Sequence, residues 1–373
     1  MVELEHGGAV LRVNTPQGPR RFHGVWLRDN AQDDATRDPR NGQRLVTLAD
    51  LPGDCSMSDA QMTGGAVQVT FAQDAKTVRF DVGWLADHAY DVPIDRSSGQ
   101  LPQGATAWDA TLSNLVPTGA LTQMQTSTTA LRDWLGALRR YGFAKVTGLR
   151  QEQGSLFDIV DLFGYVRETN YGRLFEVRTE VNPVNLAYTG LGLQAHTDNP
   201  YRDPQPTVQV LACLENSAAG GENMVVDGFA AARRLRDEDP DGFDLMTQHC
   251  ARFSYTGSAG VALHSRRPMI ELAPDGTLQA VRFNARSAAP LVDVPFDKME
   301  RYYTAYRRLS AIIDDPAMEV QFKLSPGDAF VVDNTRVLHA RKGYSGVGTR
   351  WLQGCYADRD GILSTLAALE ATA

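Results

Sequence analysis

Long apolar runs and clustered cysteines are both missing from this sequence. No stretch is apolar for the roughly 20 residues that a transmembrane helix needs, and the first residues, MVELEHGGAVLRV, lack the basic start and apolar run of a secretory signal. The four cysteines lie far apart in a chain of 373 residues, unlike a disulfide framework or a cysteine-rich zinc site. These absences predict a cytoplasmic protein that has reduced thiols and no membrane partner.

Positive charge is also scarce. The chain has 37 Lys and Arg against 45 Asp and Glu, which gives a net charge of −8, and the basic residues are scattered along it. Because no basic stripe is present to bind a phosphate backbone, we expect no nucleic-acid partner. The sequence has neither an internal repeat nor a biased tract, and with 43% hydrophobic residues the whole chain is expected to fold.

Composition divides the chain into three parts. Residues 1–95 carry short alternating segments separated by polar or Gly/Pro-rich stretches, which predicts a small β-rich N-terminal domain. Residues 96–118 are rich in Pro and Gly and have little periodicity, as in a linker. Residues 119–373 then form the main domain.

The main domain is expected to be mainly β with flanking helices. Helical spacing of Leu131, Leu135 and Leu138 predicts a helix from Ser127 or Thr128 to about residue 141, and further helices are expected at 156–163 and 297–313. Short runs rich in β-formers predict many strands. We expect strands at 143–146, 207–214, 223–228, 278–284, 319–324, 329–334 and 350–357. Many short strands behind a helical layer favour an antiparallel barrel or jelly roll.

Four residues carry the candidate chemistry. His196 and Asp198 are two apart, so on a strand both side chains would point to the same face. His339, from a distant strand, completes a set of two imidazoles and one carboxylate, which covers one face of an octahedral ion and leaves positions open, as in Fe(II) oxygenases. Arg350 lies on the next predicted strand, where its planar guanidinium can bind a carboxylate with two hydrogen bonds.

From Phe22 to the C-terminus, the sequence resembles the γ-butyrobetaine and trimethyllysine dioxygenases of the taurine-dioxygenase-like group. The shared motifs are FHGVWLRDN, NLAYTG, AHTDNPY, GGENMVVDGF, DNTRVLHARKGY and RWLQGCYADRD. The resemblance implies a double-stranded β-helix (jelly-roll) catalytic domain, a homodimer and a small-molecule substrate. It also implies Fe(II) at His196, Asp198 and His339, with 2-oxoglutarate and O2 as co-substrates and ascorbate as an activator in assays.

The reaction that the resemblance implies is hydroxylation of an unactivated carbon, coupled to conversion of 2-oxoglutarate to succinate and CO2. Arg350 would anchor the distal carboxylate of 2-oxoglutarate, and Leu211 would pack against it. One departure concerns zinc, because relatives with a structural zinc carry three closely spaced cysteines after WLRDN, where this chain has AQDDAT. The fourth zinc ligand of those relatives, a histidine, is also missing, and Lys76 lies near its position. We therefore expect no zinc.

The substrates of the resembled family carry a trimethylammonium group, which aromatic faces bind best. At the position of Phe175, which is one of the cage positions, the family usually has Trp. Aromatic residues in general are most often packed in the core, so the alternative is that these residues only fill the core. Relatives donate hydrogen bonds to the substrate carboxylate at the positions of Asn185 and Asn284, although each could instead cap a turn. The cage positions of the family map onto Tyr171, Phe175, Tyr188 and Tyr356.

The anionic end of the substrate is the point that remains open. Asn199, Arg202 and Arg286 supply donors that suit a phosphonate, which favours the branch resembling 2-(trimethylammonio)ethylphosphonate dioxygenase, hydroxylating the carbon next to phosphorus. The alternative is γ-butyrobetaine hydroxylation to carnitine. Two other classes also remain: a zinc hydrolase on the same ligands, which would leave Arg350 without a role, and a non-catalytic quaternary-ammonium binding protein.

Overall fold

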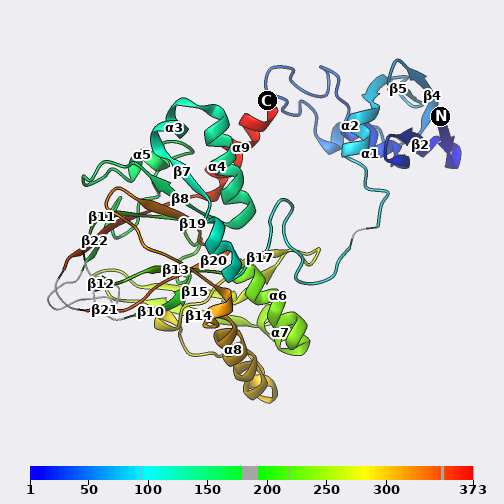
Figure 1. Ribbon diagram of the computed structural model, residues 1–373. Helices are drawn as coiled ribbons and strands as arrows, with labels where there is room; N and C mark the ends of the chain where they lie inside the picture. The colour runs from blue at the N-terminus through cyan, green and yellow to red at the C-terminus, as the bar shows by residue number, and fades with distance from the viewer. Residues whose placement is uncertain (94, 179–191, 218, 346–347, 373) are drawn as a thin grey trace. The chain divides into compact units, whose positions relative to one another are not determined.

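The computed structural model describes residues 1–93, 95–178, 192–217, 219–345 and 348–372 (Figure 1). The chain forms two compact units, Met1–Asp95 and Arg96–Ala373. Within the described ranges, no helix combines the length and apolar character needed to cross a membrane.

The unit Met1–Asp95 consists of two three-stranded antiparallel sheets and two short helices around one apolar core. That core includes Leu11, Phe22, Val67 and Phe80, all fully buried. The sheets are β1 (Val2–Glu5), β2 (Val10–Thr15) and β3 (Gly18–His23), and β4 (Met57–Thr63), β5 (Ala66–Phe71) and β6 (Thr77–Asp81), with helices α1 (Gly24–Asp29) and α2 (Val82–Asp87).

Strand β3 ends at His23, and α1 begins directly after it at Gly24. A Cβ atom at Gly24 would lie 2.1 Å from the carbonyl oxygen of Cys55, so the close backbone approach at this turn requires glycine. Further along, Lys76 Nζ lies 2.9 Å from Asp33 Oδ1 and 3.0 Å from Thr36 Oγ1. An ion pair therefore joins the AQDDAT stretch to the Lys76 position.

The unit Arg96–Ala373 is built on two sheets, which gives the predicted mainly β architecture. The larger sheet has the order β7-β8-β19-β11-β22-β9, and the smaller one β10-β20-β13-β18. Neighbours are antiparallel except β7 and β8. The larger sheet comprises β7 (Thr118–Ala120), β8 (Phe143–Thr147), β9 (Phe175–Arg178), β11 (Val208–Asn216), β19 (Ala329–Asp333) and β22 (Arg350–Ala357). The smaller sheet comprises β10 (Leu193–His196), β13 (Asn223–Asp227), β18 (Glu319–Phe322) and β20 (Val337–Arg341).

Helices cover this β core on two sides. Figure 1 shows α3, α4 and α9 beside β8 and β19, where Trp134, Leu135 and Leu366 share an apolar cluster with the larger sheet. A second cluster unites α6, α7 and α8 with strands of the smaller sheet. The helices are α3 (Leu121–Thr126), α4 (Thr128–Tyr141), α5 (Phe157–Val160), α6 (Gly228–Glu238), α7 (Pro240–Gln248), α8 (Met299–Ile313) and α9 (Arg359–Ala371).

Short two-stranded pairs complete the unit. They are β12 (Ala219–Gly220) with β21 (Tyr344–Ser345), β14 (Cys250–Tyr255) with β15 (Leu263–Pro268), and β16 (Ile270–Leu272) with β17 (Leu278–Val281). Several predicted elements are shorter than expected, among them the strand predicted over 319–324, which ends at Phe322. The helix predicted over 156–163 is α-helical only in α5, and the strand predicted over 278–284 ends at Val281.

Residues 96–118 are anchored to the unit Arg96–Ala373. Trp108 is buried, its backbone N–H donates to Asp227 Oδ2 at 3.1 Å, and its indole donates to the Tyr141 carbonyl at 2.7 Å. Arg336 donates to the Thr106 carbonyl at 2.6 Å and forms a fully buried ion pair with Asp227. This segment therefore forms part of the core of its unit.

Candidate active site

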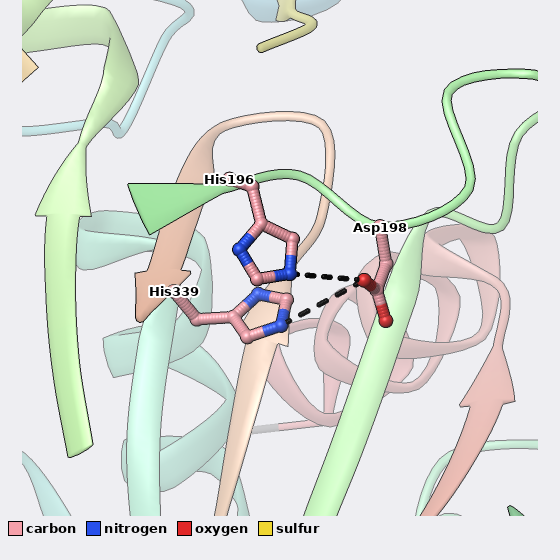
Figure 2. Close-up of side chains that lie close together, drawn as sticks. All are labelled: His196, Asp198 and His339. Atoms are coloured by element: carbon pink, nitrogen blue, oxygen red, sulfur yellow. Dashed lines mark ion pairs between the residues drawn. The ribbon is translucent and has the colours of Figure 1, made fainter. Parts of the chain in front are cut away.

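Two histidines lie directly opposite each other on neighbouring strands of the smaller sheet. Strands β10 and β20 pair antiparallel with His196 directly opposite His339, and the two imidazole centroids are 4.5 Å apart. Opposite residues of an antiparallel pair project to the same face, so both rings point toward Asp198 (Figure 2).

Asp198 completes the cluster from just beyond the end of β10, and not from within the strand as predicted. Its Oδ1 lies 3.3 Å from His196 Nε2 and 3.9 Å from His339 Nε2, and the three ligand atoms all lie within 4.8 Å of one another. Asn334 replaces the missing strand pairing, because its side-chain amide accepts from the Asp198 N–H at 2.7 Å and donates to the Asp198 carbonyl at 2.9 Å.

The protonation states of the cluster suit a divalent metal. His196 Nδ1 lies 2.8 Å from the Gln194 carbonyl, which can only accept, so Nδ1 carries the proton and Nε2 presents its lone pair. Burial, together with the neighbouring His196, lowers the pKa of His339 to about 3. Burial raises the pKa of Asp198, but the nearby His196, His339 and Arg286 outweigh that effect and lower it. Two neutral imidazoles and one carboxylate are the donor set that Fe(II) takes in such sites.

Arg286 also reaches this centre. Its Nη2 lies 2.7 Å from His196 Nε2, and because a guanidinium only donates, it uses the lone pair that a metal would take. Metal binding therefore requires the guanidinium to leave His196. Arg286 lines the same cavity as the three ligands.

The cavity has a volume of about 420 Å³, within the usual range for small-molecule sites. At one end, Arg350 is buried and donates to Asn223 Oδ1 at 3.1 Å. The Asn223 Nδ2 is buried and has no hydrogen-bond partner among the described residues. Leu211 lies on β11, next to the strand β22 that carries Arg350, and stands directly opposite Gly354 of β22. This end offers a guanidinium, an amide donor and an apolar contact.

Aromatic rings line another part of the cavity. Tyr171, Phe175 and Tyr356 all border it. The ring centroid of Phe175 lies 6.3 Å from that of Tyr171 and 5.1 Å from that of Tyr356. Sequence reasoning missed Tyr201 and Tyr255, which stack at 5.0 Å and also line the cavity. Tyr201 lies in the AHTDNPY motif, which could have indicated it, whereas nothing in the local sequence marks Tyr255.

The remaining predicted residues differ in where they lie. Asn199 lines the cavity; its Oδ1 accepts from the Tyr201 hydroxyl, and its buried Nδ2 has no partner among the described residues. Asn284 also lines it, but its amide donates to the Thr197 carbonyl and accepts from the Arg286 N–H. Arg202 is not among the lining side chains and packs against the rings of Tyr171 and Tyr201. Asn185 and Tyr188 lie outside the described residues.

Comparisons with known proteins agree with this geometry. Residues 105–356 match the family described as taurine catabolism dioxygenase TauD, TfdA family. Gamma-butyrobetaine dioxygenase of Pseudomonas sp. (strain AK-1) is 33% identical over 351 residues, covering 94% of this chain and 90% of that protein. Mitochondrial trimethyllysine dioxygenase of Gallus gallus is 28% identical over 356 residues, covering 94% and 83%.

Solved structures share the fold of the larger unit. Asparagine oxygenase superposes with a TM-score of 0.50 at 18% identity, covering 70% of this chain and 93% of that one. A putative alpha-ketoglutarate-dependent taurine dioxygenase from Burkholderia xenovorans gives a TM-score of 0.50 at 15% identity, covering 67% and 90%. At these identities the likeness shows the jelly-roll fold alone.

Proposed function

The chain belongs to the TauD, TfdA family and is an Fe(II)- and 2-oxoglutarate-dependent dioxygenase, and from this premise we propose that it hydroxylates a small trimethylammonium zwitterion. Membership of this family argues against both the zinc hydrolase and the non-catalytic binding protein. The substrate that we propose is 2-(trimethylammonio)ethylphosphonate, hydroxylated at the carbon next to phosphorus. The alternative is γ-butyrobetaine, which the 33% identity to the Pseudomonas enzyme favours.

One observation carries the proposal: aromatic rings and an arginine line the same cavity as the metal ligands. Tyr171, Phe175 and Tyr356, which form the aromatic wall of the site, supply ring faces for a cation that cannot donate a hydrogen bond. Arg286 and the Nδ2 of Asn199, which has no partner among the described residues, supply donors for an anion. A molecule with its two charges only two carbons apart would then hold the carbon next to the anion near His196.

Several polar groups of the cavity have a task in the proposed reaction. His196, Asp198 and His339 would hold Fe(II), while Arg350 and Asn223 would bind the distal carboxylate of 2-oxoglutarate. Bound iron supplies the activation of dioxygen, and the overall change converts substrate, 2-oxoglutarate and O2 into hydroxylated product, succinate and CO2. In this proposal the guanidinium of Arg286 turns from His196 toward the substrate anion, which fixes the reacting carbon in place.

The test is a coupled assay with anaerobically purified protein, Fe(II), 2-oxoglutarate, ascorbate and air. The phosphonate and γ-butyrobetaine are offered separately, while succinate and a product one oxygen heavier are measured. We expect faster turnover of the phosphonate. Preference for γ-butyrobetaine would replace the proposal with carnitine formation, and failure of both would refute the trimethylammonium pocket.

A pair of arginine variants sharpens this test. Removing the charge with Arg286→Gln should raise the KM for the phosphonate roughly 10-fold or more, the usual loss for a charged hydrogen bond. Arg202→Gln is the matched control, because Arg202 packs against the ring of Tyr171 but does not line the cavity. Equal effects of the two variants would contradict the role of Arg286.

The proposal extends to the organisation of the protein. We propose that Arg96–Ala373 is the catalytic domain, that Met1–Asp95 is an N-terminal domain without zinc, and that the enzyme works in the cytoplasm as a homodimer. Light scattering on the purified full chain would measure the mass, and a monomer would refute the dimer.

A further inference from the structure

The two oxygens of the Asp198 carboxylate have different surroundings. Oδ1 faces the Nε2 atoms of both histidines. Oδ2 accepts from Gln209 Nε2 at 2.6 Å and from the Tyr356 hydroxyl at 2.8 Å. Because Oδ2 already accepts two hydrogen bonds, only Oδ1 is left for a metal.

The two donors are fixed by the larger sheet. Gln209 on β11 stands directly opposite Tyr356 on β22, so their side chains project from the same face toward one oxygen. Gln209 is 2% exposed and Tyr356 is 4% exposed. An ionised carboxylate only accepts, so the amide of Gln209 must turn its nitrogen toward Asp198.

Stability alone does not account for Gln209. Its Oε1 is buried and has no hydrogen-bond partner among the described residues, and a buried unsatisfied oxygen is unfavourable for folding. An apolar side chain of similar length would remove that penalty. The role of Gln209 is therefore better explained by its hydrogen bond to Asp198, which fixes the orientation of that carboxylate, than by packing in the core.

We propose that Gln209 and Tyr356 are positioning residues that hold Asp198 as a one-oxygen metal ligand. Binding through one oxygen leaves more metal positions open for 2-oxoglutarate and dioxygen. Tyr356 then joins two parts of the site, because its ring packs against Phe175 in the aromatic wall while its hydroxyl binds the metal ligand. The inference rests on the metal ligands of the proposed function but not on the identity of the substrate.

The test measures the affinity for Co(II), an air-stable substitute for Fe(II), by calorimetric titration of the full chain. Gln209→Leu removes the amide donor, and Tyr356→Phe removes only the hydroxyl and keeps the ring. Each should weaken Co(II) binding roughly 10- to 100-fold, as loss of a partner of a metal ligand usually does. The visible spectrum of bound Co(II) should also change, since it reports the number of ligand atoms.

Two matched controls remove similar groups elsewhere. Gln353→Leu deletes a fully buried amide from the same sheet, where it bonds Glu176 and Gly154 and not Asp198. Tyr302→Phe deletes a buried hydroxyl that has no partner among the described residues. Both should keep Co(II) affinity within about twofold of the wild type, the scatter expected for sites that do not interact.

The inference is overturned if Gln209→Leu and Tyr356→Phe both bind Co(II) as the wild type does, or if the controls lose as much affinity. Thermal melting of each variant without metal separates loss of fold from loss of affinity. If both variants lose Co(II) affinity while the wild type hydroxylates neither zwitterion, the substrate proposal fails and this inference stands.

Discussion

At the scale of single residues, Gly354 makes the aromatic wall possible. Strands β9 and β22 pair Phe175 opposite Gly354, and the phenyl ring lies over the glycine. A Cβ at Gly354 would be 2.3 Å from Phe175 Cζ and 3.0 Å from Leu211 Cδ2. The absence of a side chain therefore lets the Phe175 ring pack closely against β22, beside Leu211.

We predict that Gly354→Ala displaces Phe175 and weakens binding of the trimethylammonium substrate several-fold. The added methyl group meets a ring and a leucine in a packed wall, where overpacking costs about 1–3 kcal/mol. Calorimetric titration of the substrate would measure the loss. Gly136→Ala is the control, since a Cβ there meets nothing within 4 Å. Unchanged affinity in Gly354→Ala would show that the ring does not contact the substrate.

Sequence reasoning found the residues that lie in motifs and missed those that the sheet brings in. His196, Asp198 and His339 stand out because their residue types and spacing have a chemical meaning, and the structure brings them together. Gln209 has no such marking, because a glutamine in an apolar strand shows its role only once Tyr356 is known to be its neighbour. Tyr255 was missed for the same reason.

At the scale of elements, short runs of β-forming residues predicted β8, β11, β13, β17, β18, β19 and β22, whereas β9, β14, β15 and β16 were not predicted. The ends of the elements depended on capping. The predicted strand over 223–228 ends at Asp227, whose carboxylate accepts from the Phe229 N–H and begins α6. The helix predicted from Ser127 or Thr128 to about residue 141 is confirmed as α4, with the Ser127 side chain as its cap. Helices α6, α7 and α9 were not predicted, although Phe229, Ala232 and Leu235 recur at helical spacing and are buried in α6.

The Asp227–Arg336 ion pair joins several of these elements. Arg336 is 2% exposed and donates to Asp227, Thr106 and Arg140, while Asp227 also caps α6. We predict that Arg336→Met destabilises the protein by about 3–5 kcal/mol, because a buried carboxylate loses its partner. Urea unfolding would measure the loss. The exposed Arg150, paired with Glu152, is the comparison, and Arg150→Met should change stability by less than about 1 kcal/mol. Similar losses of stability in the two variants would mean that burial of the Asp227–Arg336 pair does not increase its contribution to stability.

At the scale of the whole molecule, the two units should respond differently to metal. The one group of candidate metal ligands found among the described residues, His196, Asp198 and His339, lies in Arg96–Ala373. In Met1–Asp95, Lys76 and Asp33 form an ion pair, and Cys55 is the single cysteine. A metal therefore has ligands in one unit, whereas the other is held by its apolar core and ion pairs.

Calorimetric melting of the full chain tests this difference. Co(II) with 2-oxoglutarate at about 100 times its Kd should stabilise the catalytic unit by about 2.7 kcal/mol, which raises its melting temperature by roughly 5–10 °C. Arg336→Met identifies that transition, because it lowers the same one. EDTA should leave the transition of Met1–Asp95 in place, since no thiolate cluster there depends on zinc. A lower melting temperature of that unit in EDTA, with one zinc per chain by elemental analysis, would mean that other ligands have replaced the missing cysteines.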